Sequence, residues 1–187
     1  MDITIQIDSR EKTHAISHIT KYFDINNIKY YTNKLLVADY CNLHNPTITV
    51  DRKMSLVEIQ NNITIGHQRF RNELILAQEN EIKLIVLIEE SQIKTLEDVR
   101  DKYINPRMKQ WSMARKKALN KGLEFKQRPP LSGKQIYEIL NTMEQKYGCK
   151  FMFCRKEEMA KKIIKILTTE RKELEKIWLD NKEKEFM

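Results

Sequence analysis

The sequence predicts an α/β fold, in which strands and helices alternate along the chain. Polar and apolar residues alternate over residues 3–7 and 47–53, as in strands with one buried face, whereas apolar residues recur at helical spacing over residues 14–23 and 132–147. The mostly apolar run at residues 83–88 is typical of a strand that is covered on both faces. With 187 residues, the chain is long enough to bury a sizeable core.

The first hundred residues are expected to supply most of the sheet. Helices at residues 14–23 and 67–80 each present one apolar face, formed in the first by Ile16, Ile19 and Phe23. In order, the expected elements are a strand at 3–7, a helix at 14–23, strands within 28–53 with turns at 32–33 and 42–46, helices at 55–61 and 67–80, and a central strand at 83–88.

The remaining residues are expected to be mainly helical. Ser132 and Gln135 can form a capping box at the start of a helix that Gly148 ends, and a short strand follows at residues 150–154. A last helix at residues 157–178 carries an apolar stripe that suits either core packing or a seam between two copies of the chain. The stripe contains Ala160, Ile163, Ile164, Leu167, Leu174, Ile177 and Trp178.

The organisation that these patterns predict is a core with a basic extension. Residues 1–100 are expected to form the core, and residues 101–187 a basic linker plus a helical C-terminal region that packs on the core as one domain. Between Lys102 and Arg128 there are nine basic residues and one acidic residue, with aromatic residues interleaved. Such a segment suits phosphate contacts and stacking on unpaired bases, although a solvated surface helix or a mobile loop has the same composition.

Composition narrows the class of protein. The chain has 34 Lys and Arg against 26 Asp and Glu, and this net charge of +8 favours a polyanionic partner. Three cysteines without a signal peptide indicate reduced thiols and a cytoplasmic location. The longest uninterrupted apolar run, residues 84–88, is far too short to cross a bilayer, so no membrane association is expected.

The candidate catalytic residues are Asp39, Asp51 and Lys53. Alternation over residues 47–53 puts Asp51 and Lys53 on one face of a strand, and Asp39 ends a short apolar run that is expected to be a strand as well. An antiparallel pairing of the two segments would bring the two carboxylates together. Converging carboxylates suit Mg²⁺ or Mn²⁺, and a nearby lysine can stabilise charge that develops on a phosphate. The alternative is that these residues are solvated on an edge strand.

Four sequence blocks together resemble, in order, those of the XPF/Mus-type structure-specific nucleases. The blocks are IDSRE at residues 7–11, LVADY at 36–40, VDRK at 50–53 and RFRNEL at 69–74. They correspond to the D-x-R-E, G-D-Y, E-R-K and R-F motifs of that family. This chain departs from the pattern at Ala38, where the family has glycine, at Asp51, where it has glutamate, and at Val57, where many members have an acidic residue.

The resemblance implies a restriction-endonuclease-like fold, a mixed sheet flanked by helices with a helical C-terminal region. It places Asp8 and Glu11 close to the metal, although both suit structural roles, and it makes Arg10 and Arg69 either ion-pair partners or phosphate contacts. It also implies DNA cleavage near a boundary between single and double strands, often by a dimer. The residues expected to contact DNA are Arg10, Arg52, Arg69, Arg107, Arg115, Lys116 and Lys117.

Blocks in the second half, such as NPR at 105–107 and YGCKFMFC at 147–154, look like those of short phage and prophage members. Those members lack the tandem helix-hairpin-helix module of many cellular ones, and the sequence shows no such module. We therefore expect a Mg²⁺- or Mn²⁺-dependent endonuclease for branched, flap or junction DNA, which forms a homodimer. The competing hypotheses are a nuclease fold that binds DNA or serves as a scaffold without cutting it, and an RNA-directed or exonucleolytic enzyme.

Overall fold

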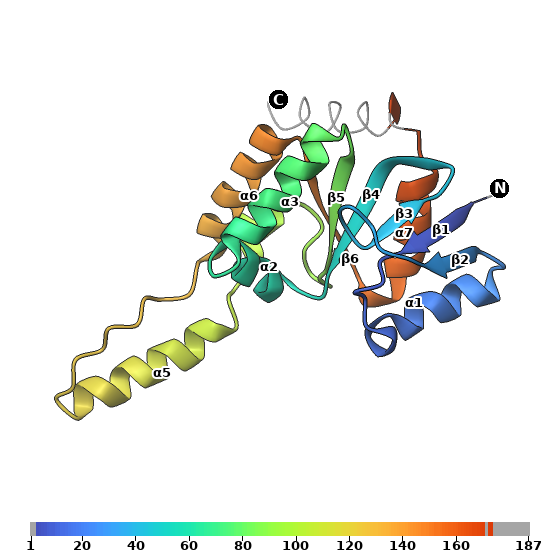
Figure 1. Ribbon diagram of the computed structural model, residues 1–187. Coiled ribbons are helices and arrows are strands. Elements are labelled where there is room, and N and C mark those ends of the chain that lie inside the picture. Colours follow the sequence, from blue (N-terminus) through green and yellow to red (C-terminus); the bar gives the residue numbers. More distant parts are fainter. Residues whose placement is uncertain (1–2, 171, 174–187) are drawn as a thin grey trace.

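The protein is built around one six-stranded mixed sheet that lies between two layers of helices (Figure 1). The computed structural model describes residues 3–170 and 172–173. The strand order is β2-β1-β3-β4-β5-β6. This architecture confirms the α/β class and the mixed sheet flanked by helices.

The sheet combines parallel and antiparallel pairs. The third strand in this order, β3, runs antiparallel to both of its neighbours, β1 and β4, and the remaining pairs are parallel. The strands are β1 (Thr4–Ile7), β2 (Lys29–Thr32), β3 (Tyr40–Asn42), β4 (Asn45–Lys53), β5 (Lys83–Glu89) and β6 (Lys150–Cys154). The predicted central position of the apolar strand is confirmed, because β5 lies between β4 and β6.

Helices cover both faces of the sheet and create two cores (Figure 1). On one face α1 (Thr13–Ile25) and α7 (Met159–Thr168) pack over side chains such as Ile48 and Val50. On the other face α2 (Leu56–Ile63), α3 (His67–Glu79), α4 (Leu96–Lys102) and α6 (Gly133–Tyr147) pack over Leu84, Val86 and Ile88. The alternation along β4 therefore assigns Asp51 and Lys53 to the second face and Arg52 to the first.

One predicted strand is wrong. Residues 35–39 form a loop in which Leu36 is 57 % exposed and Ala38 has a φ of 65°, and β3 begins only at Tyr40. The reason is that side chains bind the backbone of this loop in place of a neighbouring strand. Leu35 N donates to Asp8 Oδ2 over 2.7 Å, and Ala38 N donates to Glu73 Oε1 over 3.0 Å.

The C-terminal region belongs to the same body. Residues 133–168 contribute β6, α6 and α7 to the sheet and its two cores, and the predicted capping box of Ser132 and Gln135 is present. Helix α7 ends at Thr168, short of the predicted helix at 157–178, because Thr169 is extended. Ile163 and Leu167 are buried in the chain's own core, as core packing predicts. Leu174, Ile177 and Trp178 lie outside the described residues.

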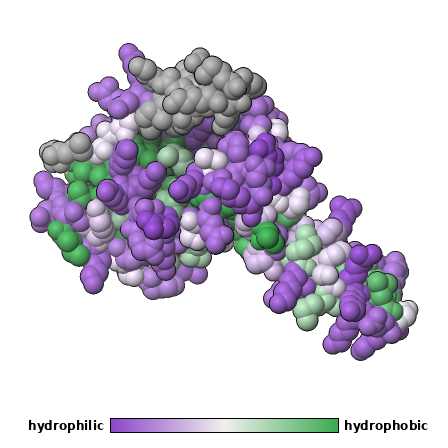
Figure 2. Space-filling view, turned by 180° about the vertical axis from the view of Figure 1, so that it is seen from behind, coloured by the Kyte–Doolittle hydropathy of each residue, from purple (hydrophilic) through white to green (hydrophobic). Residues whose placement is uncertain are grey.

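Residues 104–131 form an arm that leaves the body (Figures 1 and 2). Its helix α5 (Arg107–Asn120) has no buried residue, and an extended segment returns from its tip toward α6. The surface of the arm is mostly hydrophilic, with small hydrophobic patches (Figure 2). Neither α5 nor any other helix in the described part of the chain is long and apolar enough to span a membrane.

Candidate active site

The pairing of β3 with β4 brings Asp39 and Asp51 together. Tyr40 faces Val50 in this antiparallel pair, so Asp39, one residue before β3, lies opposite Asp51. Asp39 N donates to Val50 O over 3.0 Å, and Asp39 Oδ2 accepts from Arg52 N at 2.8 Å. The juxtaposition expected from the sequence is therefore present, although the chain before β3 is a loop.

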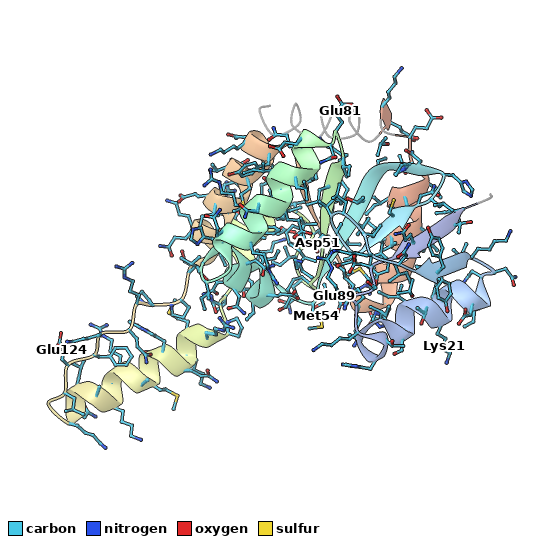
Figure 3. The ribbon with its side chains drawn as sticks, in the orientation of Figure 1. Lys21, Asp51, Met54, Glu81, Glu89 and Glu124 are labelled. Atoms are coloured by element: carbon cyan, nitrogen blue, oxygen red, sulfur yellow. The ribbon has the colours of Figure 1, made fainter. Side chains whose placement is uncertain are left out.

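Lys53 lies next to Asp51 on the same face of β4. Its Nζ is 2.6 Å from Asp51 Oδ1, and both side chains are buried. The ammonium group also lies 6.0 Å from the centre of the Phe70 ring in α3. The two-residue period of the strand thus delivers a carboxylate and an ammonium group to one point, where Figure 3 shows Asp51 near the centre of the molecule.

The two carboxylates carry more negative charge than their surroundings neutralise. Burial raises the pKa of Asp39 to about 6, although the positive charge of Lys53 lowers it. Burial raises the pKa of Asp51 to about 7, and the negative charge of Asp39 adds to the rise. The positive charge of Lys53 acts in the opposite direction and lowers this pKa. Asp51 is 2 % exposed, and its buried Oδ2 has no hydrogen-bond partner in the described part of the chain. A cation at this point would satisfy both the charge and the free oxygen.

Glu11 lies at the edge of this cluster, in the turn that precedes α1. Its Oε2 is 3.6 Å from Arg52 Nη2, and burial raises its pKa while the positive charges of Arg52 and Lys53 lower it. The carboxylate is therefore within the electrostatic reach of the predicted catalytic residues but is paired with Arg52.

Asp8, predicted to support the metal, holds the neighbouring turn and loop together. Its carboxylate accepts from Arg10 N at 2.8 Å and from Leu35 N at 2.7 Å, and it forms a two-point ion pair with the Arg10 guanidinium at 2.6 and 3.0 Å. Arg10 is thus an ion-pair partner, one of the two roles considered for it. The geometry favours a structural role for Asp8, because its oxygens are occupied by backbone and guanidinium donors.

Glu73 in α3 belongs to the site but was not predicted. It accepts the backbone hydrogen bond of Ala38, the residue before Asp39, and burial together with the negative charge of Asp51 raises its pKa. Two signals in the sequence could have revealed it. Glu73 falls inside the RFRNEL block, and it lies three residues after Phe70, so both are on the same side of the helix.

Arg52 faces away from Lys53 and does not reach the surface. It is 7 % exposed and forms ion pairs with Glu89 at 2.8 Å and with Glu11 at 3.6 Å. Two acidic partners and burial on the α1 side of the sheet suit a structural ion pair better than the predicted contact with DNA.

The other residues expected to contact DNA are spread over α3 and the arm. Arg69 is exposed at the start of α3, and Arg107 Nη1 donates to Asn61 Oδ1 at 2.8 Å. Arg115 lies over the Trp111 ring at 5.5 Å, while Lys116 and Lys117 are exposed. The ring of Trp111 packs edge-on against that of Phe125 at 5.8 Å, so these two rings contact each other within the arm.

The donor set fits a small divalent cation held by few protein ligands. The described residues contain no group of three or more His, Cys, Asp or Glu side chains arranged to hold a metal ion. Mg²⁺ nevertheless prefers oxygen ligands and is commonly bound through one or two carboxylates, with water and substrate phosphate completing its shell. Asp39 and Asp51, with a free buried oxygen on Asp51, suit that mode of binding.

Comparison with known proteins identifies the family. The ERCC4 domain model matches residues 7–167, which is most of the chain. Two solved structures of XPF from Aeropyrum pernix share the fold: the first has a TM-score of 0.54 at 15 % identity, and the second, a complex with DNA, has 0.55 at 14 %. The matches cover 89 % and 92 % of this chain, but only 62 % and 70 % of those chains. No curated protein matches the chain.

Proposed function

The chain belongs to the ERCC4 domain family, and on this basis we propose that it is a divalent-metal-dependent endonuclease that cuts DNA at branches, flaps or junctions. The observation that carries the proposal is the buried cluster of Asp39, Asp51 and Lys53, in which Lys53 pairs with Asp51, its positive charge also lowers the pKa of Asp39, and Asp51 Oδ2 has no partner among the described residues. Such a cluster suits hydrolysis of a phosphodiester, because both metal and charge stabilisation are available at one point.

Each residue of the cluster has a distinct proposed role. Asp39 and Asp51 would hold Mg²⁺ or Mn²⁺ through their carboxylate oxygens. When bound, such an ion would lower the pKa of a water molecule and neutralise charge on the phosphate. Lys53 would orient the attacking water and stabilise the negative charge that the phosphate gains. Glu73 would keep Asp39 in position through the backbone of Ala38.

The rival function is DNA binding without cleavage, and one observation favours it. Asp51 stands where the family has the longer glutamate, and its Oδ1 is already paired with Lys53 at 2.6 Å. A shorter carboxylate that is occupied by a lysine holds a metal ion less readily. The two functions differ in a simple assay, because a binding protein retains its affinity for DNA and releases no product.

The test is incubation with labelled flap, fork, four-way junction and linear duplex DNA, in Mg²⁺, Mn²⁺, Ca²⁺ or EDTA. We expect cleavage of the branched substrates in Mg²⁺ or Mn²⁺, binding with little turnover in Ca²⁺, and no cleavage in EDTA. Substrates with blocked ends and RNA-containing copies separate an endonuclease from an exonuclease and DNA from RNA. Cleavage that persists in EDTA would contradict the metal-dependent mechanism.

Single substitutions test the cluster itself. Asp39→Asn, Asp51→Asn and Lys53→Ala should each slow cleavage by at least about 100-fold while DNA binding changes little, because metal and charge act mainly in the transition state. Asp24→Asn and Lys21→Ala serve as matched controls, since both residues are exposed on α1 and Lys21 lies far from Asp51 in Figure 3. Undiminished cleavage by all three variants would remove the cluster from the mechanism.

We also propose that the protein acts as a homodimer, since a two-fold pair would hold two active sites at a fixed distance from a branch point. Ile163 and Leu167 are buried within the chain, so this part of the predicted stripe is not available for the seam. Light scattering over a range of concentrations measures the assembly, and a monomer that cuts junctions efficiently would exclude it.

A further inference from the structure

The two ends of the arm are clamped together at the body. Asn105, which is 4 % exposed, donates from Nδ2 to Leu131 O over 2.9 Å and so joins the outgoing chain to the returning chain. Gly133 packs so closely on the end of α4 that a Cβ atom would lie 2.2 Å from Val99 O and 2.9 Å from Tyr103 O. Only glycine permits this approach. The arm is therefore an insertion between α4 and α6 with a closed base.

The base of the arm is also tied to the helix that follows the catalytic strand. Asn105 Nδ2 donates to Gln60 Oε1, and Arg107 Nη1 donates to Asn61 Oδ1 over 2.8 Å. Both acceptors lie in α2, which begins three residues after Lys53. An eight-residue helix is about 12 Å long, so a short rigid element joins the cluster of Asp39, Asp51 and Lys53 to the arm.

The arm is held together internally by one tryptophan. Trp111 Nε1 donates to Gln127 O at 3.0 Å, and its ring contacts that of Phe125. These contacts fasten the returning segment to α5. They also place the two aromatic rings in edge-on contact with each other, which does not suit a flat platform on which unpaired bases could stack.

Exposed positive charge lies along α5 of the arm. Lys109 and Lys116 are seven residues apart and therefore on one face of α5, with Lys117 beside them, and all three are exposed. Glu124, the one acidic residue of the arm, pairs with Lys126 at 3.3 Å. With 14 residues, α5 is about 21 Å long. That length matches about six base pairs at about 3.4 Å of helix axis each.

We propose that the arm binds the phosphates of a double-stranded DNA segment outside the active site, and that its base sets the position at which the DNA is cut. This proposal rests on the proposed function. Exposed lysines on a helix suit sequence-independent phosphate contacts, and the packed aromatic rings favour duplex over single strands. The contacts of Asn105, Gln60 and Arg107 fix the angle of the arm, so that a duplex held there presents a defined phosphate to the active site.

The first experiment measures binding in EDTA, where no cleavage is needed. The triple variant K109A/K116A/K117A should bind duplex DNA more weakly, and the slope of log K against log salt should fall by about 0.9 for each lost contact. The matched control K21A/K29A/K161A removes three exposed lysines from the body and should keep the wild-type slope. An unchanged slope in the arm variant, or an equal fall in the control, would overturn the proposal. Because this readout does not involve catalysis, it can succeed even if nuclease activity is absent.

The second experiment maps the cut. Asn105→Ala loosens the base without changing the charge of the arm, so the salt slope should stay at the wild-type value while the cut on a flap substrate spreads over several neighbouring phosphates. Gln145→Ala, an exposed change on α6, should leave the cut unchanged. If Asn105→Ala does not fold, Gln60→Ala weakens the same base from α2. A wild-type cut pattern from a folded base variant would show that the arm does not set the position.

A second copy of the chain is the other partner that the arm could have, because Met113, Leu119 and Leu123 are exposed along it. Light scattering of K109A/K116A/K117A and of Met113→Ser decides between the two partners. The proposal predicts the wild-type assembly for both variants. Dissociation of Met113→Ser into a smaller species, together with weaker DNA binding, would identify the arm as an assembly surface instead.

Discussion

The sheet that carries the candidate active site and the arm that projects from the body use charge in opposite ways. Asp51 is 2 % and Lys53 9 % exposed, and they lie among hydrogen bonds that join β4, α3 and the loop before β3. In α5, by contrast, no residue is buried and the lysines face water. Charges in the sheet therefore remain costly until a partner arrives, whereas charges in the arm cost little and act over a distance. The buried cluster in the sheet therefore suits chemistry at one point, whereas the exposed lysines of the arm suit attraction of a negatively charged partner from a distance.

Stability should separate these two regions most clearly. Phe23 is fully buried against the sheet, and Phe23→Ala should lower the free energy of unfolding by about 3 to 5 kcal/mol. Trp111 belongs to neither core, so Trp111→Ala should lower it by less than about 1 kcal/mol. Urea denaturation followed by circular dichroism measures both. A comparable loss for Trp111→Ala would mean that the arm unfolds together with the body as one cooperative unit.

The contrast also explains which features the sequence could predict. Burial leaves a periodic signal, so the central strand β5, the stripe of α1 and the capped start of α6 were all predicted near their observed limits. The loop at residues 35–39 carries the same apolar signal, yet Asp8 and Glu73 bind its backbone from distant positions. A contact that depends on two remote side chains leaves no local pattern, so the apolar run at residues 35–39 predicts a strand where the chain forms a loop.

For the arm, the sequence predicts the charge but not the structure. Its charge was evident from the composition, but a basic run predicts neither a projecting helix nor its direction. The direction depends on Asn105, Gln60 and Gly133, which lie in three separate segments and are brought together by the hydrogen bond of Asn105 to α2 and by the packing of α6 on α4. The sequence also does not indicate that two of the interleaved aromatic residues, Trp111 and Phe125, pack against each other.

Asp39 offers a way to measure the excess charge of the site. Burial raises its pKa to about 6 in the folded chain, above the usual 3.8. Its contribution to stability is therefore fully present below about pH 4 and is lost as the pH rises through about 6. Without metal, Asp39→Asn should thus be more stable than the wild type at pH 8, by an amount on the order of 2 kcal/mol, and the difference should vanish near pH 4.

Thermal denaturation in EDTA at several pH values measures this difference, and Asp24→Asn on the surface of α1 is the control. Added Mg²⁺ should raise the Tm of the wild type more than that of the Asp39→Asn variant, because a ligand that binds the folded state stabilises it. A variant that is less stable than the wild type at pH 8 would show that the site already compensates its own charge.

Glu73 tests whether hydrogen bonding or charge holds the loop before β3. Glu73→Gln keeps an oxygen that can accept from Ala38 N, whereas Glu73→Ala removes it. If the hydrogen bond positions Asp39, the Ala variant should cleave about tenfold more slowly than the Gln variant, which corresponds to about 1.4 kcal/mol. The Ala variant should also need more Mg²⁺ for half-maximal rate. Equal rates and equal metal dependence in the two variants would leave only the charge of Glu73 as a cause.

Ala38 gives the smallest expected effect, and it tests whether the site tolerates strain that the arm does not contain. Its φ of 65° lies in the left-handed region, which costs an alanine about 1 to 2 kcal/mol. Glycine avoids that strain but loses about 0.5 to 1 kcal/mol through the greater freedom of the unfolded chain, so Ala38→Gly should raise the free energy of unfolding by about 0.5 kcal/mol.

In the arm, Ala114 lies within a regular helix, and Ala114→Gly should only weaken that helix, by about 1 kcal/mol. Urea denaturation for Ala38→Gly and helical circular dichroism for Ala114→Gly measure the two changes. Destabilisation by Ala38→Gly would mean that contacts of the Ala38 methyl group in its core outweigh the backbone strain.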